Sequence, residues 1–195
     1  MKNVMFALAL TAILHTSQAT AGVYDVDQDH TSIGFSVKHM VVSNVKGVFD
    51  QVTGTFTLDE KDQLTGAEAT IDAASVNTRN EKRDDHLRSP DFFDAAKYPK
   101  ITFKVTAIKA HQIHYMVTGE LTIKGVTKPV KLMGEMVGKV KDPYGNTRAG
   151  FTATGKINRK DFGVNFHKLL EAGGLVVGDE VKLLLEIEGV ERKGN

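Results

Sequence analysis

The sequence contains no cysteine among its 195 residues. The chain can therefore form neither disulfides nor cysteine-ligated zinc sites, and it has no thiol for catalysis or haem attachment. It also has no N-terminal cysteine that a lipid could modify. An apolar core must then hold the fold together, and a chain of this length can bury one.

The sequence also lacks an excess of charge of either sign. It has 25 Lys and Arg residues against 24 Asp and Glu, which gives a formal charge of +1. Loss of Lys2 with an N-terminal leader brings that charge to zero. Because no basic field is present to hold a phosphate backbone, nucleic acid is not expected as a partner.

Residues 1–21 have the pattern of a cleaved secretory signal peptide. Lys2 precedes an apolar run from Val4 to Leu14, and Ala19-Thr20-Ala21 before Gly22 fits an A-x-A cleavage site. The run is well short of the roughly 20 residues that span a bilayer, so no stable transmembrane anchor is expected. We expect residues 22–195 to form one domain, secreted to the periplasm if the host is a Gram-negative bacterium.

Strict alternation of apolar and polar residues dominates the chain after residue 22. It is clearest over residues 32–38, 101–107, 113–124 and 181–188. A period of two residues is typical of antiparallel strands with one buried and one exposed face. About eight such strands predict an all-β fold, either a closed barrel or a sandwich.

The inward register mixes large apolar residues with alanine and glycine. Small residues on an inner wall leave volume, and an eight-stranded barrel then has room for one ligand. Glycines can instead mark bends and bulges. We expect an apolar tunnel whose predicted lining is Phe35, Val37, Phe56, Phe103, Val117, Gly119, Leu132, Phe151 and Ala153.

Residues 78–97 interrupt the alternation and predict a short helical insertion. Asn80 to Arg88 has a helical pattern, and Ser89-Pro90 begins a second turn. The helix is polar almost all round, which favours a position over a barrel mouth rather than in a core. Phe92, Phe93 and Tyr98 are the expected anchors against the barrel.

Asp84-Asp85-His86 raises the question of a metal site or an acid–base cluster. Adjacent residues on a helix point about 100° apart, so these three do not converge on one ion. We expect a solvated helix face or a polar gate, with Asp84 and Arg88 forming an ordinary surface pair. The other histidines show no metal-ligand spacing, and Ser36 lacks a nucleophile elbow. No metal site and no catalytic residue are expected.

Polar groups at the rim of an apolar cavity suit an amphiphile, whose head stays outside while its tail is enclosed. Arginine would suit a pyrophosphate head, whereas histidine or tyrosine would suit a quinone, and the sequence does not choose between them. The candidate head-group residues are His30, His39, Arg83, His86, Arg88, Arg159 and Asp161.

Five segments in this order resemble the YceI family of polyisoprenoid-binding, lipocalin-like periplasmic proteins. They are YDVDQDHTSIGFSVKHM, VKGVFDQVTGTF, RDDHLRSPDFFDAAKYPKITF, GELTIKGVTKPV and INRKDFGV. The resemblance covers essentially all of the chain after the leader. It implies an eight-stranded antiparallel lipocalin-like β-barrel with a helical insertion, a homodimer, and a long isoprenoid chain in an apolar tunnel. It does not imply an enzyme.

The expected function is that of a periplasmic carrier for an isoprenoid-type amphiphile, either a polyprenyl lipid or an isoprenoid quinone. No cofactor is required, although the bound lipid or quinone is itself a candidate cofactor. The alternative is a quinone-linked redox or stress-response protein that uses this lipid. A third class is a structural or adhesion module whose barrel is plugged by its own side chains.

Overall fold

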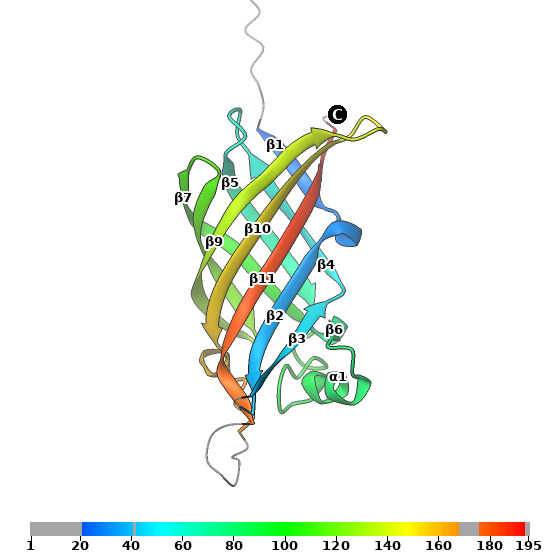
Figure 1. Ribbon diagram of the computed structural model, residues 1–195, viewed down its shortest axis with the longest axis vertical. Helices are drawn as coiled ribbons and strands as arrows, with labels where there is room; N and C mark the ends of the chain where they lie inside the picture. Colours follow the sequence, from blue (N-terminus) through cyan, green and yellow to red (C-terminus); the bar gives the residue numbers. More distant parts are fainter. Residues whose placement is uncertain (1–20, 41, 168–175, 194–195) are drawn as a thin grey trace, which may run out of the picture.

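The computed structural model describes residues 21–40, 42–167 and 176–193, which form one closed sheet (Figure 1). Nearly all of the predicted signal peptide, residues 1–20, lies outside the described residues. The strands are β1 (Gly22–Val26), β2 (Ser32–His39), β3 (Ser43–Phe49), β4 (Val52–Leu58), β5 (Leu64–Asp72), β6 (Val76–Asn77), β7 (Lys100–His111), β8 (His114–Ile123), β9 (Val126–Lys141), β10 (Thr147–Asn158) and β11 (Val177–Glu191).

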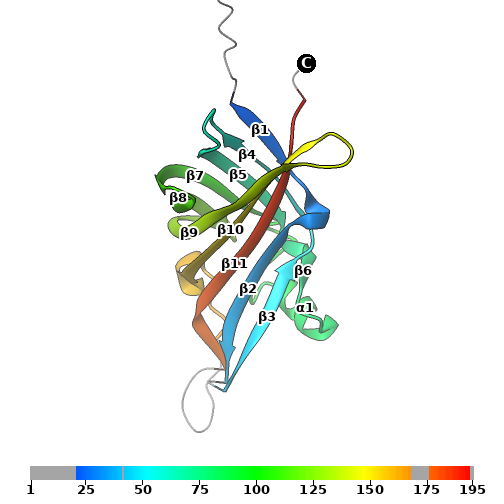
Figure 2. The same cartoon turned by 45° about the horizontal axis from the view of Figure 1, so that its top comes forward.

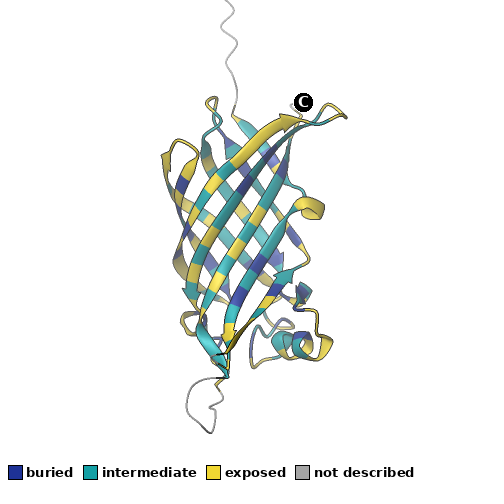
Figure 3. Cartoon of the chain, viewed as in Figure 1, coloured by how far each residue is buried: buried dark blue, intermediate teal, exposed yellow. Residues whose placement is uncertain are grey.

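The eleven segments make eight strands, because three strands are interrupted. The short 3-10 helix η1 (Gln28–His30) divides β1 from β2, and both segments pair with β11. Asp50 and Gln51 divide β3 from β4, and η2 (Ala73–Ser75) divides β5 from β6. Antiparallel pairing of β1 with β11 closes the barrel. The predicted eight-stranded antiparallel barrel is therefore confirmed, and burial alternates along its strands (Figure 3).

β1 begins and β11 ends at the same end of the barrel (Figure 2). Aromatic side chains of β1, β4, β8 and β10 pack together at this end. Tyr24 stacks on Phe56 with ring centroids 4.9 Å apart. Phe151 meets Phe56 edge-on at 5.2 Å and Tyr115 at 5.8 Å. Tyr24 and Tyr115 are almost fully buried. This aromatic cluster closes one end of the barrel, because rings of this size leave little free space between eight strands.

Glycines on the inner wall lie directly beneath aromatic rings of the neighbouring strands. A Cβ atom at Gly47 would come 2.5 Å from Cζ of Phe35, and one at Gly119 would overlap the ring of Phe103. Each ring therefore lies flat against the wall instead of projecting across the barrel. The glycines contribute to the free volume indirectly, by accommodating a neighbouring ring.

The predicted insertion is present at the opposite end of the barrel, where it contains the helix α1 (Glu81–Arg88). The side chain of Asn80 caps the helix by accepting the Arg83 amide at 3.0 Å. Among the residues described, no helix is long and apolar enough to cross a membrane. A run of turns follows α1 and leads into β7.

Aromatic side chains fasten this insertion to the barrel. Phe92 is 7% exposed, and Phe93 meets Phe49 edge-on at 5.5 Å. Tyr98 lies over Gly125, where a Cβ would come 2.8 Å from the ring. The three expected anchors thus all contact the barrel or are buried beside it, which fixes the insertion over the barrel end.

The side chains of Asp84, Asp85 and His86 point to different partners, as expected for adjacent residues of a helix. The predicted ion pair between Asp84 and Arg88 is wrong. Asp84 is buried and accepts hydrogen bonds from the amide and hydroxyl of Thr78, at 2.9 and 2.5 Å. Arg88 binds Asp85 instead, at 2.9 Å, and His86 binds Asp91 at 2.9 Å. Helical spacing permitted the Asp84–Arg88 pair, but the segment preceding the helix turns back and offers Asp84 two donors.

Candidate functional site

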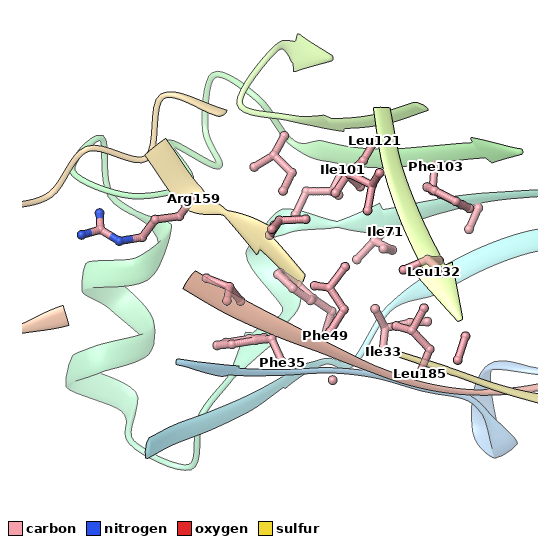
Figure 4. A pocket seen from close by; sticks show the side chains of 18 of the residues that line it. Ile33, Phe35, Phe49, Ile71, Ile101, Phe103, Leu121, Leu132, Arg159 and Leu185 are labelled. Atoms are coloured by element: carbon pink, nitrogen blue, oxygen red, sulfur yellow. The ribbon is translucent and has the colours of Figure 1, made fainter. Parts of the chain in front are cut away.

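The barrel encloses an apolar cavity of about 550 Å³ (Figure 4). Within the part of the chain described, the barrel is not filled by its own side chains, which argues against the plugged-barrel class. Eight of the nine predicted lining residues line it: Phe35, Val37, Phe56, Phe103, Val117, Leu132, Phe151 and Ala153. Gly119 does not, because the Phe103 ring covers it.

Further lining comes from residues that the prediction left out. Most lie on the same inward register, so the alternation already contained their signal: Ile33, Phe49, Ile71, Ile101, Leu121, Ile123, Leu183, Leu185 and Ile187. Phe92 and Phe93 come from the insertion, whereas Phe162, Val164 and Phe166 follow β10. No periodic pattern marks these last five, because they lie outside regular strands.

Basic side chains gather where the cavity reaches the α1 end of the barrel. His39, Arg83, His86 and Arg159 were predicted at the rim and do line the cavity, and Lys38 joins them. They come from the end of β2, from α1 and from η3 (Arg159–Phe162). The apolar wall therefore ends in a set of cations and imidazoles, which suits the boundary between a lipid tail and a polar head.

Arg159 was predicted as a head-group residue, but its guanidinium group forms hydrogen bonds within the protein. Its guanidinium donates to the carbonyl oxygens of Val164, Gly178 and Val177 at 2.7, 2.9 and 3.2 Å. It also binds Asp179 at 3.0 Å. Burial lowers the pKa of Arg159, and the charge of Asp179 opposes that shift. In Figure 4 its side chain extends away from the labelled apolar residues.

The Arg159→Leu variant is expected to lose about 3 kcal/mol of unfolding free energy, because it leaves buried carbonyls and Asp179 without their donor. Urea unfolding followed by circular dichroism measures the loss. Arg192→Leu, which removes an exposed pair with Asp25, serves as control and should cost far less. Equal losses in the two variants would contradict the structural role of Arg159.

Arg83 is held in place without being neutralised. Its Nε donates to the Thr78 hydroxyl at 2.7 Å, and its Nη2 donates to the Thr78 carbonyl at 2.9 Å. Thr78 is itself fixed by the buried Asp84. Among the described residues, no carboxylate forms an ion pair with Arg83, and its Nη1 makes no hydrogen bond. Arg83 therefore keeps a free donor at the polar end of the cavity.

Three predicted rim residues lie elsewhere. Arg88 donates to the Ala74 and Val76 carbonyls at 2.7 and 3.2 Å and so ties α1 to β6. Asp161 is exposed on η3 and does not line the cavity. His30 lies in η1 on the outside of the barrel, where its Nδ1 meets Asp27 at 3.0 Å. Their places in the sequence gave no information about which way these side chains point.

His30, Asp27 and Glu188 come close enough together to hold a metal ion. A guanidinium already supplies positive charge there, because Arg148 contacts Asp27 at 2.7 Å and Glu188 at 2.6 Å. Its Nε binds Asp142 at 2.9 Å. Arg148 holds the pKa values of Asp27 and Asp142 below their ordinary range, chiefly through these hydrogen bonds. The group is thus a charge network that joins η1 to the β9–β10 turn.

This network predicts acid sensitivity. Carboxylates with lowered pKa stabilise the fold above the unfolded value of 3.8, and that contribution is lost as the pH falls through the lower folded values. Arg148→Met is expected to be less stable near neutral pH, yet to lose less stability, or to gain some, on acidification. Urea titrations between about pH 7 and pH 3 measure this. Parallel stability profiles for the two proteins would contradict it.

Comparison with known proteins places this geometry in a family. The YceI-like domain family matches residues 24–189. A relative from Photorhabdus laumondii, UPF0312 protein plu2095, is 43% identical over 192 residues, which cover 95% of this chain and 97% of that protein. A match of this length includes both the barrel and the insertion.

Solved structures share the architecture. The YceI protein of Campylobacter jejuni is 37% identical, with a TM-score of 0.69 over 86% of this chain and 96% of that one. A polyisoprenoid-binding domain from Saccharophagus degradans has a TM-score of 0.66 over 87% of this chain and 98% of that one. At 16% identity, this second likeness concerns the fold alone.

Proposed function

The chain belongs to the YceI-like domain family, and from this premise we propose that it is a carrier for an isoprenoid-type amphiphile, which it binds without chemical turnover. The observation that carries the proposal is the apolar cavity of about 550 Å³ inside a closed barrel. Each methylene buried there contributes about 0.8 kcal/mol before ordering costs reduce it. A solved domain of the same fold is named for polyisoprenoid binding, which supports this ligand class.

The polar head is proposed to lie at the α1 end, beside Arg83, His39 and His86. Each guanidinium nitrogen of Arg88 and Arg159 donates to a carbonyl or carboxylate oxygen. Nη1 of Arg83 makes no hydrogen bond among the described residues, so Arg83 is the predicted rim arginine with a whole nitrogen left to donate. The opposite end is packed by the Tyr24–Phe56–Phe151–Tyr115 rings. A tail therefore enters pointing toward the aromatic cluster, and its head remains near the insertion.

The carrier is proposed to act in the periplasm of a Gram-negative host. The support is the signal-peptide pattern of residues 1–21. Expression in such a host, followed by fractionation and N-terminal sequencing, tests the location. A mature protein that begins at Gly22 in the periplasmic fraction is expected, and an uncleaved cytoplasmic product would overturn this part of the proposal.

Native mass spectrometry of the protein purified from its own host tests the function. A co-purifying isoprenoid lipid is expected, and adding a polyprenol to stripped protein should raise its melting temperature by mass action. Absence of both effects would overturn the carrier proposal. The alternative quinone-linked redox role requires electron transfer from membranes to a bound quinone, and the proposed carrier should show none.

A homodimer is proposed through the outer face of β9, β10 and β11. Three neighbouring rows of outward side chains there differ in character, as the strand registers show. The middle row is apolar, with Met133 55% and Leu184 41% exposed beside Thr154. The flanking rows are acidic on one side, Glu135, Thr152 and Glu186, and basic on the other, Lys131, Lys156 and Lys182.

A twofold axis that lies in the plane of the contact, along the middle row through Thr154, makes this face complementary to itself. It sets each strand over the same strand of the second copy, running in the opposite direction, and it exchanges the acidic and basic rows. Glu186 then faces Lys182 of the second copy, Glu135 faces Lys131, and Met133 and Leu184 each pack on their counterparts. Closed pairs of this symmetry are the commonest homo-oligomers. Opposite charges across the contact favour this register over others.

Sedimentation velocity tests the dimer with a charge exchange. The Glu186→Lys variant is expected to dissociate, and the double variant Glu186→Lys/Lys182→Glu should reassociate because the pair is restored in reverse. Glu120→Lys, an exposed change on β8 outside this face, serves as the matched control. A monomeric wild-type protein, or a double variant no more associated than the single one, would overturn the arrangement.

A further inference from the structure

The hairpin between β2 and β3 lies at the α1 end of the barrel (Figure 1). Its tip carries exposed apolar side chains. Met40 is 42% exposed and Val42 is 86% exposed. Turns of this kind usually hold Gly, Asn, Asp, Ser or Pro. Met40 has a φ of 49°, in the left-handed region that favours glycine. A side chain that suits neither water nor this backbone conformation points to a use other than stability.

The backbone of this tip is held in place. The Met40 amide donates to the Val176 carbonyl at 3.0 Å, which joins the hairpin to the start of β11. His39 pairs with both Ser43 of β3 and Val177 of β11. The backbone that carries the exposed apolar side chains is therefore fixed to both β3 and β11.

Two lysines flank the tip on the same hairpin. Lys38 and Lys46 are exposed, and among the described residues neither forms an ion pair with a carboxylate. The nearby acidic groups of β11 are engaged elsewhere, since Asp179 binds Arg159 and Lys160, and Glu180 binds Lys156. Apolar residues bordered by unneutralised cations are typical of a surface that inserts shallowly into an anionic lipid interface.

The tip also adjoins the polar end of the cavity. Lys38 and His39 line the cavity from β2, and Val176 and Val177 line it from the start of β11. The far end of the barrel is closed by the aromatic cluster. An isoprenoid lipid resides in a bilayer before it is carried, so a docking surface is useful only at the end where the lipid enters.

We propose that the β2–β3 tip docks the protein on an anionic phospholipid surface. Met40 and Val42 insert among the head groups, and Lys38 and Lys46 contact the phosphates. The lipid then passes between bilayer and cavity without crossing open water. This inference rests on the proposed carrier function, because docking at this end serves transfer into the cavity.

The β9–β10 hairpin at the opposite end provides a matched control. Val140 and Tyr144 there are 64% and 86% exposed, at least as much as Met40 and Val42 at the tip. Lys139 of that hairpin is neutralised by Asp62 at 2.6 Å. Both hairpins are apolar and basic in composition, but only the β2–β3 tip adjoins the polar end of the cavity.

The experiment compares vesicles of phosphatidylcholine alone with vesicles that also contain phosphatidylglycerol. Extraction of a fluorescent polyprenol from the vesicles is followed for wild type, Val42→Asp, Lys38→Ala/Lys46→Ala and the control Val140→Asp. Extraction from phosphatidylglycerol vesicles should slow at least about tenfold in Val42→Asp and about tenfold or more in the lysine pair. Val140→Asp should match wild type. The lysine effect should vanish on phosphatidylcholine vesicles or at high salt.

Uptake of the same polyprenol from detergent solution separates the two proposals. Wild-type protein that takes up nothing from detergent would overturn the carrier function itself. Normal uptake from detergent with unchanged extraction by Val42→Asp would overturn the docking tip alone. Slowed extraction in Val140→Asp but not in Val42→Asp would place docking at the opposite end. Val42→Asp that sediments with vesicles as wild type does would also contradict the inference.

Discussion

Ala153→Phe is expected to lower affinity for a polyprenol about a hundredfold while the barrel stays folded. Ala153 lies on β10 between Gly134 of β9 and Leu185 of β11, and it lines the cavity. A benzyl group at this position would project into the cavity. It would therefore occupy the volume of the ligand's tail and would not displace a neighbouring side chain. Fluorescence titration with a labelled polyprenol measures the affinity.

The matched control for this variant is Ala107→Phe, at an exposed position of β7. It adds the same group to the outside of the barrel and should leave affinity unchanged. Circular dichroism and thermal unfolding establish that both variants fold. Undiminished polyprenol binding by folded Ala153→Phe would mean that the ligand lies outside this cavity.

Gly119→Val is expected to unfold more easily by about 3 kcal/mol. The first carbon of its side chain would overlap the Phe103 ring and approach the Lys104 carbonyl oxygen at 2.8 Å. The backbone cannot move away, because Gly119 pairs with Val105 on one side and Val130 on the other. Chemical unfolding of ligand-free protein measures the loss.

A second variant tests whether the ring is the cause. Phe103→Leu/Gly119→Ala reduces the overlap and should be more stable than Gly119→Ala combined with native Phe103. Gly66→Ala is the control, since a Cβ at Gly66 meets nothing within 4 Å. If Gly119→Val and Gly66→Ala destabilise the protein equally, the packing of Phe103 on Gly119 has little energetic weight.

The alternation predicted that Gly119 faces inward, but it did not predict what covers this glycine. A two-residue period decides which way a side chain points, so the barrel and most of its lining followed from Phe35, Val117 and similar positions. It does not tell how neighbouring strands fill the space above a glycine. That depends on cross-strand register, which sets Phe103 beside Gly119 only after β7 and β8 have paired with a shift between Val105 and Ala107.

At the rim, by contrast, the sequence did not predict which arginines are free to bind a ligand. Arginine was a reasonable head-group candidate at each position, but an arginine has five donors and backbone carbonyls compete for them. Arg159 and Arg88 are bound by the protein itself, because the strands β11 and β6 begin beside them at Val177 and Val76, whose carbonyl oxygens accept from the two guanidinium groups. Arg83 met only Thr78 and kept a donor. Which acceptors lie near each guanidinium group depends on where the loops run, and loops carry no periodic signal in the sequence.

The three interrupted strands have a consequence for how the barrel opens. The β3–β4 break and the β5–β6 break lie beside one another, because the Asp50 amide donates to the Ser75 carbonyl and the Asp72 amide donates to the Gln51 carbonyl. Beyond these breaks, β6 pairs with β3 alone among the described strands, so the ladder stops there. Arg88 of α1 donates to the Val76 carbonyl at this edge. Amide protons of β3, β6 and α1 should therefore exchange with solvent sooner than those of β8 to β10, as a separate unit of lower stability.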